Sequence, residues 1–244
     1  MLPPMQVSNK VIAHRGASAY APENTLAAFN KALAMGCRCV EFDVILSADG
    51  EPFVFHDESL KRTTNGQGRI GEVTAEYLQS LDAGSWFSKS WRDEKIPHFR
   101  DVLKWLVFTE CNANIEIKPY PGKSEETTVT VLSYLHRHWP AATSLPLVSS
   151  FDWSVLTLCR TLAPEMPLGL LLDEWDDHWA GKAGELQCYS IHLNRRILNA
   201  KRVQTIKEQG YQVFAYTVNR KRQAMKLLEW GVDAVFSDYP DLLS

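Results

Sequence analysis

The sequence predicts an α/β protein that folds as a single TIM (β/α)8 barrel. Three observations support this fold class: the length of 244 residues, the 45% content of hydrophobic residues, and a regular alternation of short apolar runs with amphipathic helical patterns. Nine strand candidates are present, and one of them resembles the return arm of a hairpin. The eight others match the number of parallel strands in a closed barrel, so residues 1–244 are predicted to form one domain.

The first strand is predicted over residues 10–16, where an apolar run ends in His14 and Arg15. A helix that Asn24 or Thr25 can cap follows it. After the hairpin and a long connecting segment, strands and helices alternate to the end of the chain. These later strands are predicted over residues 114–118, 147–151, 168–172, 189–193, 212–218 and 234–237, and helices over 101–110, 124–138, 153–162, 199–209 and 220–230.

The hairpin that follows the first helix carries acidic residues. Glu41 and Asp43 lie two apart in an apolar, β-branched run, so in a strand both carboxylates leave the same face. Asp49 and Gly50 predict a two-residue turn, which would place Asp43 directly opposite His56. Carboxylates this close among apolar residues need a compensating cation. The alternative is a surface hairpin whose polar face meets water.

Residues 58–98 form a long segment after this hairpin. The segment is rich in Thr, Asn, Gly and Ser, but it also carries Trp86, Phe87 and Trp91. Loops of this length are functional or disordered, and three large aromatic residues argue against disorder. We therefore expect an inserted lid or small subdomain, whose aromatic side chains either fasten it to the barrel or cover a ligand and exclude water.

Composition restricts the classes of partner. The formal net charge is −3, and acidic and basic residues are mixed along the chain, so no basic footprint for nucleic acid is present. The five cysteines form no C-x-x-C pair and are expected to be reduced core residues. Residues 1–10 lack the apolar region of a secretory signal, so a cytoplasmic protein without stable membrane association is expected. Nothing in the sequence specifies an oligomeric state.

Polar residues accumulate where the predicted strands end, which is the end of a TIM barrel that carries the chemistry. Charged side chains facing a barrel interior are difficult to explain by packing. Alternatives exist, because His14 could be a core histidine and Glu116 could form a structural ion pair with Lys118. The candidates are His14, Glu41, Asp43, Glu116, Lys118, His192 and Tyr216.

Several short motifs occur in order along the chain: Ala13-His14-Arg15-Gly16, Pro22-Glu23-Asn24-Thr25, Glu41-Phe42-Asp43-Val44, His56-Asp57, Asp82-Ala83-Gly84-Ser85-Trp86, Ile115-Glu116-Ile117-Lys118, Tyr216-Thr217-Val218-Asn219 and Gly231-Val232-Asp233. Together they resemble the glycerophosphodiester phosphodiesterase family, most closely its bacterial cytosolic members. The resemblance extends from residue 11 to residue 240. One departure is Tyr216, which stands where many members carry Trp.

The resemblance implies a TIM barrel that hydrolyses deacylated phospholipids, such as glycerophosphocholine and glycerophosphoethanolamine, to sn-glycerol 3-phosphate and an alcohol. It also implies a divalent metal ion, Mg²⁺ or Ca²⁺, and a place in glycerophospholipid and glycerol metabolism. A barrel that binds phosphodiesters without cleaving them is one alternative, and a phospholipase acting on intact lipids is another. The absence of an amphipathic surface segment disfavours the phospholipase.

The expected metal ligands are Glu41, Asp43 and Glu116. This set offers carboxylate oxygens and no thiolate, which suits Mg²⁺ or Ca²⁺ better than structural zinc. The metal would draw charge from the phosphoryl oxygens. A non-cleaving binder would need no proton-transfer pair in addition to these three carboxylates.

Arg15 and Lys118 are expected to bind the phosphate, and Glu23 either supports the first helical turn or orients Arg15. His14 and His56 are the expected proton-transfer pair, with the assignment of acid and base left open. The nucleophile is also open, because either the glycerol 2-hydroxyl attacks and forms a cyclic phosphate, or water attacks directly.

Three further residues are expected at the substrate. Trp86 and Tyr216 are candidates for contacts with the glycerol or the head group. His192 is a third candidate, although a hydrogen-bonded wall residue explains it equally well.

Overall fold

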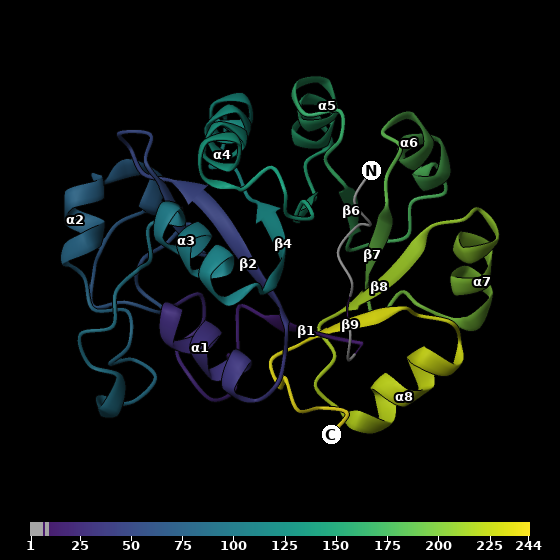
Figure 1. Cartoon of the computed structure of the whole chain (residues 1–244), viewed down its shortest axis with the longest axis horizontal. Coiled ribbons are helices and arrows are strands. Elements are labelled where there is room, and N and C mark those ends of the chain that lie inside the picture. The colour runs from purple at the N-terminus through teal and green to yellow at the C-terminus, as the bar shows by residue number, and fades with distance from the viewer. Residues whose placement is uncertain (1–6, 8–9) are drawn as a thin grey trace.

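The computed structural model describes residue 7 and residues 10–244. Within this part of the chain, nine strands form one sheet in the order β1-β9-β8-β7-β6-β5-β4-β2-β3, and an additional pairing of β1 with β2 closes it. The pairings around the closed ring are parallel, and β3 is antiparallel to β2. Helices surround the strands (Figure 1). The molecule is therefore a TIM barrel, which confirms the predicted fold class.

The observed strands lie within a few residues of the predicted ones. Their bounds are β1 Val11–His14, β2 Cys39–Leu46, β3 Pro52–Val54, β4 Asn112–Ile117, β5 Leu147–Ser150, β6 Leu168–Leu172, β7 Ser190–Asn194, β8 Gln212–Tyr216 and β9 Ala234–Ser237.

Most of the helices also match their predictions. Their bounds are α1 Leu26–Ala34, α2 Ala75–Ser80, α3 Phe99–Thr109, α4 Ser124–His138, α5 Trp153–Leu162, α6 Trp179–Glu185, α7 Ala200–Glu208 and α8 Lys221–Glu229, with short 3-10 turns at Ile70–Glu72 and Lys89–Trp91. The short helices α2 and α6 have no predicted counterpart. In α6, the glycines Gly181 and Gly184 weaken the helical signal.

Among the described residues, every helix is too short or too polar to cross a lipid bilayer. The expectation that residues 1–10 are not a secretory signal falls mainly on residues 1–6 and 8–9, which lie outside the described residues.

The turn after β1 brings α1 close to the mouth of the barrel. Arg15 and Gly16 both have positive φ angles, of 54° and 81°. A Cβ atom on Gly16 would lie 2.7 Å from the backbone of Ala28, so the close approach of α1 requires glycine at this position. Thr25 caps α1 by accepting a hydrogen bond from Ala28 N at 3.2 Å. This geometry holds Arg15 at the end of the barrel.

Side chains of β2 alternate between the two sides of the barrel wall. Val40, Phe42 and Val44 belong to the main hydrophobic cluster that also contains the inner faces of the helices. Glu41 and Asp43 point to the opposite side and line the cavity at the barrel mouth. The predicted common face of the two carboxylates is therefore confirmed.

The barrel interior below this cavity is mainly apolar. One small cluster of buried side chains from five strands and their neighbours fills it: Ile12, Cys39, Leu147, Phe214, Ala234 and Phe236. This packed layer closes the lower end of the barrel and forms the floor on which the polar cavity rests.

The predicted register of the hairpin is wrong by one residue. Val44 pairs with Val54, and Phe55 N donates to Asp43 O at 3.0 Å, so Asp43 does not face His56 across the ribbon. The reason is a longer loop, in which Ser47 N donates to Glu51 O and Gly50 adopts a left-handed φ of 81°. His56 instead lies in the chain that follows β3.

Residues 58–98 pack on the far end of the hairpin and carry α2 (Figure 1). Apolar side chains from this segment and from the hairpin form a separate small cluster: Ile45, Phe53, Phe55, Leu60, Ile70, Leu78, Leu81, Ala83 and Ile96. The segment thus has its own apolar attachment to the barrel.

Candidate active site

A cavity of about 390 Å³ opens at the carboxyl ends of the barrel strands. It contains most of the polar residues that the sequence points to as a site. Its lining consists of His14, Arg15, Glu41, Asp43, His56, Asn114, Glu116, Lys118, Phe151, Leu171, Asn194, Arg195, Arg196, Tyr216, Thr217 and Phe236.

Three carboxylates converge on one side of this cavity. Strand β4 pairs with β2 in a register that sets Glu116 beside Asp43. Glu41, Asp43 and Glu116 can each present one oxygen so that the three oxygens lie within 4.8 Å of one another. Glu41 and Asp43 are almost fully buried. The parallel pairing of two adjacent strands therefore gathers these three acidic groups.

The charges in this cluster oppose one another. Burial, reinforced by the neighbouring carboxylates, raises the pKa of Glu41 well above its usual range and the pKa of Glu116 to about 8. Burial also acts on Asp43, but the positive charges around it, led by Arg15, and the hydrogen bond from Asn24 together hold the pKa of Asp43 below its usual range. A buried, all-oxygen donor set with this excess of negative charge fits a divalent cation.

Arg15 lies against the cluster. Its backbone N donates to Glu41 Oε2 at 2.9 Å, and its Nη1 donates to Glu23 Oε1 at 2.8 Å. Its Nε lies 3.6 Å from Asp43 Oδ2. Although burial opposes the charge of the guanidinium, Asp43, Glu23 and Glu41 raise the pKa of Arg15 above its usual value. Arg15 is therefore a fixed positive charge at the cavity wall.

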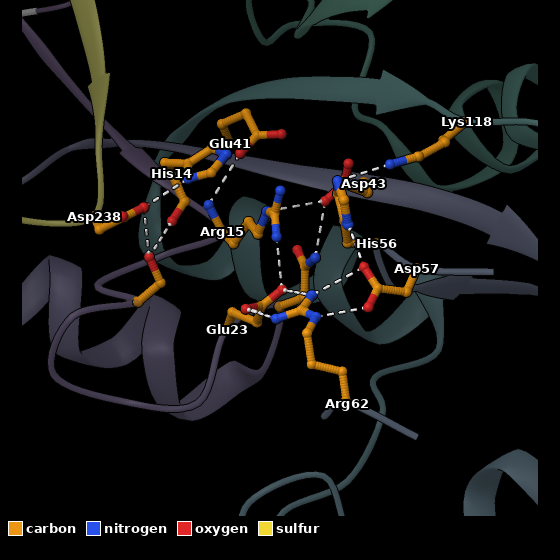
Figure 2. Close-up of polar contacts among 12 residues, drawn as sticks. His14, Arg15, Glu23, Glu41, Asp43, His56, Asp57, Arg62, Lys118 and Asp238 are labelled. Carbon is orange, nitrogen blue, oxygen red and sulfur yellow. Dashed lines mark hydrogen bonds and ion pairs between the residues drawn. The ribbon is translucent and has the colours of Figure 1, made fainter. Parts of the chain in front are cut away.

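His14, at the end of β1, is held by the chain that follows β9. Its Nδ1 lies 2.6 Å from Asp238 Oδ1 (Figure 2). Although burial opposes it, the interactions with His14, Asn219 and Ser18 together keep the pKa of Asp238 below its usual range. Because the carboxylate is ionised, the His14 Nδ1–H donates to it. The Nε2 atom of His14 has no hydrogen-bond partner among the described residues.

His56 is held in the same manner on the other side of Arg15 in Figure 2. Its Nδ1 lies 2.6 Å from Asp57 Oδ1, and its Nε2 lies 2.7 Å from Lys118 Nζ. Burial, with the charges of Arg15 and Lys118, lowers the pKa of His56 despite the attraction of Asp43. The imidazole is therefore neutral near pH 7, with Nδ1–H donating to Asp57 and Nε2 accepting from Lys118.

The remaining wall of the cavity is aromatic and basic. Tyr216 donates from its hydroxyl to Leu172 O at 2.8 Å and stands edge-to-face with Phe151, with ring centroids 5.9 Å apart. Arg195 and Arg196 follow β7 at this rim. Tyr216 therefore lies where the sequence predicts a substrate contact.

Two predicted site residues do not line the cavity. His192 is fully buried below it, hydrogen-bonded to Ser190 Oγ at 2.8 Å and stacked on Phe214. Trp86 lies in the segment 58–98, where its Nε1 donates to Ala83 O at 2.8 Å. Neither side chain therefore reaches the cavity in this structure, and a contact with substrate stays a prediction for both.

Several residues at the site are absent from the sequence-based prediction. Asp238 directly follows the last strand, and Asn114 lies two residues before Glu116 on the same face of β4, so both positions carry a signal. The amide Oδ1 of Asn114 is buried and has no hydrogen-bond partner among the described residues, which makes it a further oxygen at the cavity. Arg62 carries no such signal, because it lies in an irregular loop.

Comparisons with known proteins agree on one family. The model of the glycerophosphoryl diester phosphodiesterase family matches residues 14–242. A glycerophosphodiester phosphodiesterase of Caldanaerobacter subterraneus is 34% identical over 242 residues, covering 96% of this chain and 95% of that protein. One from Bacillus subtilis is 32% identical over 248 residues, covering 95% and 84%.

Solved structures give the same result. A phosphodiesterase from Oleispira antarctica, in complex with the product sn-glycerol-3-phosphate, is 39% identical with a TM-score of 0.91 and covers 98% of this chain and 94% of that chain. A glycerophosphodiester phosphodiesterase from Thermotoga maritima is 27% identical with a TM-score of 0.76 and covers 98% of both. With its barrel, its cavity and these relatives, the chain belongs to the glycerophosphoryl diester phosphodiesterase family, and it is a glycerophosphodiester phosphodiesterase.

Proposed function

We propose that the chain hydrolyses glycerophosphodiesters, such as glycerophosphocholine and glycerophosphoethanolamine, to sn-glycerol 3-phosphate and an alcohol in a metal-dependent reaction. The observation that carries the proposal is the joint lining of one cavity by three converging carboxylates and two imidazoles, each imidazole fixed by an aspartate. A site that only binds phosphodiesters needs no such pair of fixed imidazoles.

Glu41, Asp43 and Glu116 are the proposed ligands of a divalent cation, Mg²⁺ or Ca²⁺. Their hard oxygen donors and their excess of negative charge support this assignment. When bound, the cation supplies positive charge that polarises the phosphoryl group. Arg15 and Lys118 supply further positive charge at the same wall, Arg15 through a planar fork and Lys118 as a point charge.

His56 is the proposed general base. A neutral ring whose Nδ1–H is held by Asp57 can use Nε2 as the proton acceptor once Lys118, which donates to Nε2 in this structure, turns to the phosphate. The lowered pKa of His56 supports the neutral form. His14 is then the proposed general acid, because the leaving alkoxide needs a proton from a second group. Asp238 holds the His14 ring through Nδ1, so that proton leaves from Nε2.

The attacking group is proposed to be the glycerol 2-hydroxyl, whose proton passes to His56 Nε2, followed by water opening of the cyclic phosphate. An attack by water in the first step is the alternative. Chromatography of a single-turnover reaction distinguishes the two, because a transient cyclic glycerophosphate accumulates only on the first route.

The decisive experiment measures sn-glycerol 3-phosphate release from glycerophosphocholine, with and without EDTA. We expect release that stops with EDTA and resumes when Mg²⁺ or Ca²⁺ is returned. Binding of glycerophosphocholine without release would support the non-cleaving alternative, and release only from intact phosphatidylcholine would support the phospholipase.

The remaining assignments follow from this activity. We propose a cytoplasmic enzyme of glycerophospholipid and glycerol metabolism, formed by one domain in which residues 58–98 are an inserted subdomain. Tyr216 is the proposed contact to the substrate on the aromatic wall, because its ring and that of Phe151 line the cavity and stand edge-to-face.

A further inference from the structure

Arg62 lies in the inserted segment 58–98, yet its guanidinium makes four hydrogen bonds to two carboxylates at the active site. Nε and Nη2 donate to the two oxygens of Asp57 at 2.6 and 3.0 Å. Nη1 and Nη2 donate to the two oxygens of Glu23 at 2.7 and 2.8 Å (Figure 2). This double bidentate contact is more specific than an ordinary surface ion pair, although the Arg62 side chain is 45% exposed.

Each of these carboxylates also holds a residue that lines the cavity. Asp57 Oδ1 bonds to His56 Nδ1 at 2.6 Å, and Glu23 Oε1 accepts from Arg15 Nη1 at 2.8 Å. The same two oxygens accept from Arg62 Nη2. A movement of the Arg62 guanidinium would therefore change the positions of both His56 and Arg15.

The two ends of this network come from different connections of the barrel. Arg15 follows β1, whereas His56 and Asp57 follow β3. Arg62 joins the two connections side chain to side chain. A planar guanidinium can bind two carboxylates at once, and a lysine ammonium cannot reproduce this fork.

Holding the inserted segment in place does not explain these bonds. The segment already packs on the hairpin through its own apolar cluster, which includes Leu60, Ile70 and Leu78. Glu23 and Asp57, moreover, are also bound to Arg15 and His56, which line the cavity.

We propose that Arg62 is a positioning residue of the phosphodiesterase, which fixes Arg15 and His56 relative to each other through Glu23 and Asp57. The inference rests on the proposed function and deepens it, because it gives the inserted segment 58–98 a part in completing the active site. Arg62 itself does not line the cavity and contacts no reacting atom.

The kinetic test compares Arg62→Met with a matched control, Arg69→Met. Arg69 lies in the same segment, is 55% exposed, and donates to Glu58 at 2.9 Å without reaching the site. In the full-length protein with Mg²⁺, we expect Arg62→Met to lower kcat/KM for glycerophosphocholine by ~10–100-fold. Arg69→Met should keep the activity of the unchanged protein. Thermal unfolding of both variants verifies that they are folded at the assay temperature.

Rescue distinguishes positioning from mere attachment. Added guanidinium ion should restore part of the activity of Arg62→Met, because it can occupy the place between Glu23 and Asp57. Arg62→Lys should recover less than the guanidinium-treated variant, since a single ammonium cannot form the fork. Wild-type activity in Arg62→Met, or a loss that guanidinium leaves unchanged, would overturn the proposal.

A second measurement does not depend on hydrolysis. His14 and His56 both have Nδ1–H bonds of 2.6 Å to an aspartate, and such short bonds shift the proton resonance downfield in NMR spectra. Arg62→Met should shift or broaden the His56 resonance and leave that of His14 unchanged. Two unchanged resonances would contradict the role of Arg62, even if the protein failed to hydrolyse glycerophosphocholine and the proposed function itself were wrong.

Discussion

The upper and lower halves of the barrel interior are built from the same strands but carry different side chains. On β2, Cys39 belongs to the apolar lower layer, whereas Glu41 and Asp43 on the same face belong to the upper cavity. The apolar side chains of the lower layer are stabilised by packing. The upper layer gathers like charges that the protein neutralises only in part. A single strand therefore contributes residues both to the packed layer and to the polar cavity.

Two histidines show the same contrast. His192 lies in the lower half, where burial lowers its pKa to about 3 and Ser190 and two phenylalanine rings surround it. His14 lies in the upper half, where Asp238 holds one nitrogen and the other is left for the cavity. The position along the barrel axis, rather than the residue type, decides whether an imidazole reaches the cavity.

Replacing the histidines tests this contrast most strongly. His14→Gln and His56→Gln should each lower kcat by roughly 10²–10⁴-fold, the range for loss of a general acid or base. His192→Gln should retain kcat and lower the thermal stability, because its ring is part of the packed wall. Steady-state kinetics and thermal unfolding of the three variants provide the comparison. A loss of kcat in His192→Gln as large as that in His14→Gln would contradict the distinction between the two halves of the barrel.

The pH dependence of stability should differ between the metal-free and metal-bound protein. The pKa of Glu116 is raised to about 8 from its usual 4.5, so its contribution to stability is complete below pH 4.5 and is lost as the pH rises through 8. In EDTA, the free energy of unfolding should therefore fall across this interval by on the order of a few kcal/mol. Asp43 does not contribute to this decline, because its pKa is lowered and its ionisation changes the free energy of unfolding only at acidic pH.

Urea unfolding at a series of pH values measures this decline. Glu116→Gln should reduce it, because the variant has no carboxyl group to ionise, and a bound divalent cation should oppose it by stabilising the charged form. An equal decline in the unchanged protein and in Glu116→Gln would show that the pKa of Glu116 is not raised by burial and by Asp43 as described.

The smallest effect is expected in the lower layer. Ile12 is fully buried there, and Ile12→Val should cost ~0.5–1.5 kcal/mol of stability at every pH. Its kcat/KM should equal that of the unchanged protein at a temperature where both are folded. A change in the pH dependence of unfolding in this variant would mean that the two halves are not independent.

The regular elements could be predicted because local signals coincide with tertiary packing. The helices at Ser124–His138 and Trp153–Leu162 have both ends where the sequence predicts them. The hairpin register could not be predicted, since an Asp-Gly pair fits both a two-residue and a longer loop. Asp49 accepts from Ser47 Oγ and Ala75 N, and the second of these contacts depends on the distant segment.

For the site, the period of two along β2 predicted the common face of Glu41 and Asp43. The same rule cannot place His192 relative to the cavity, because periodicity gives the face of a strand and not the depth along the barrel. On β7, Asn194 reaches the cavity, whereas His192, two residues earlier, lies beneath it. Contacts such as the one between His14 and Asp238 join opposite ends of the chain and leave no local pattern.

Both carboxylates of β2 already accept hydrogen bonds from the protein. Arg15 N already occupies Glu41 Oε2, and the side chain of Asn24 occupies Asp43 Oδ2 at 2.9 Å. Each carboxylate therefore has one oxygen without a hydrogen-bond partner among the described residues, and a hard cation held by these residues would still need oxygen donors from water or from the substrate. Cation and substrate should then bind cooperatively, each raising the affinity of the protein for the other by the same factor.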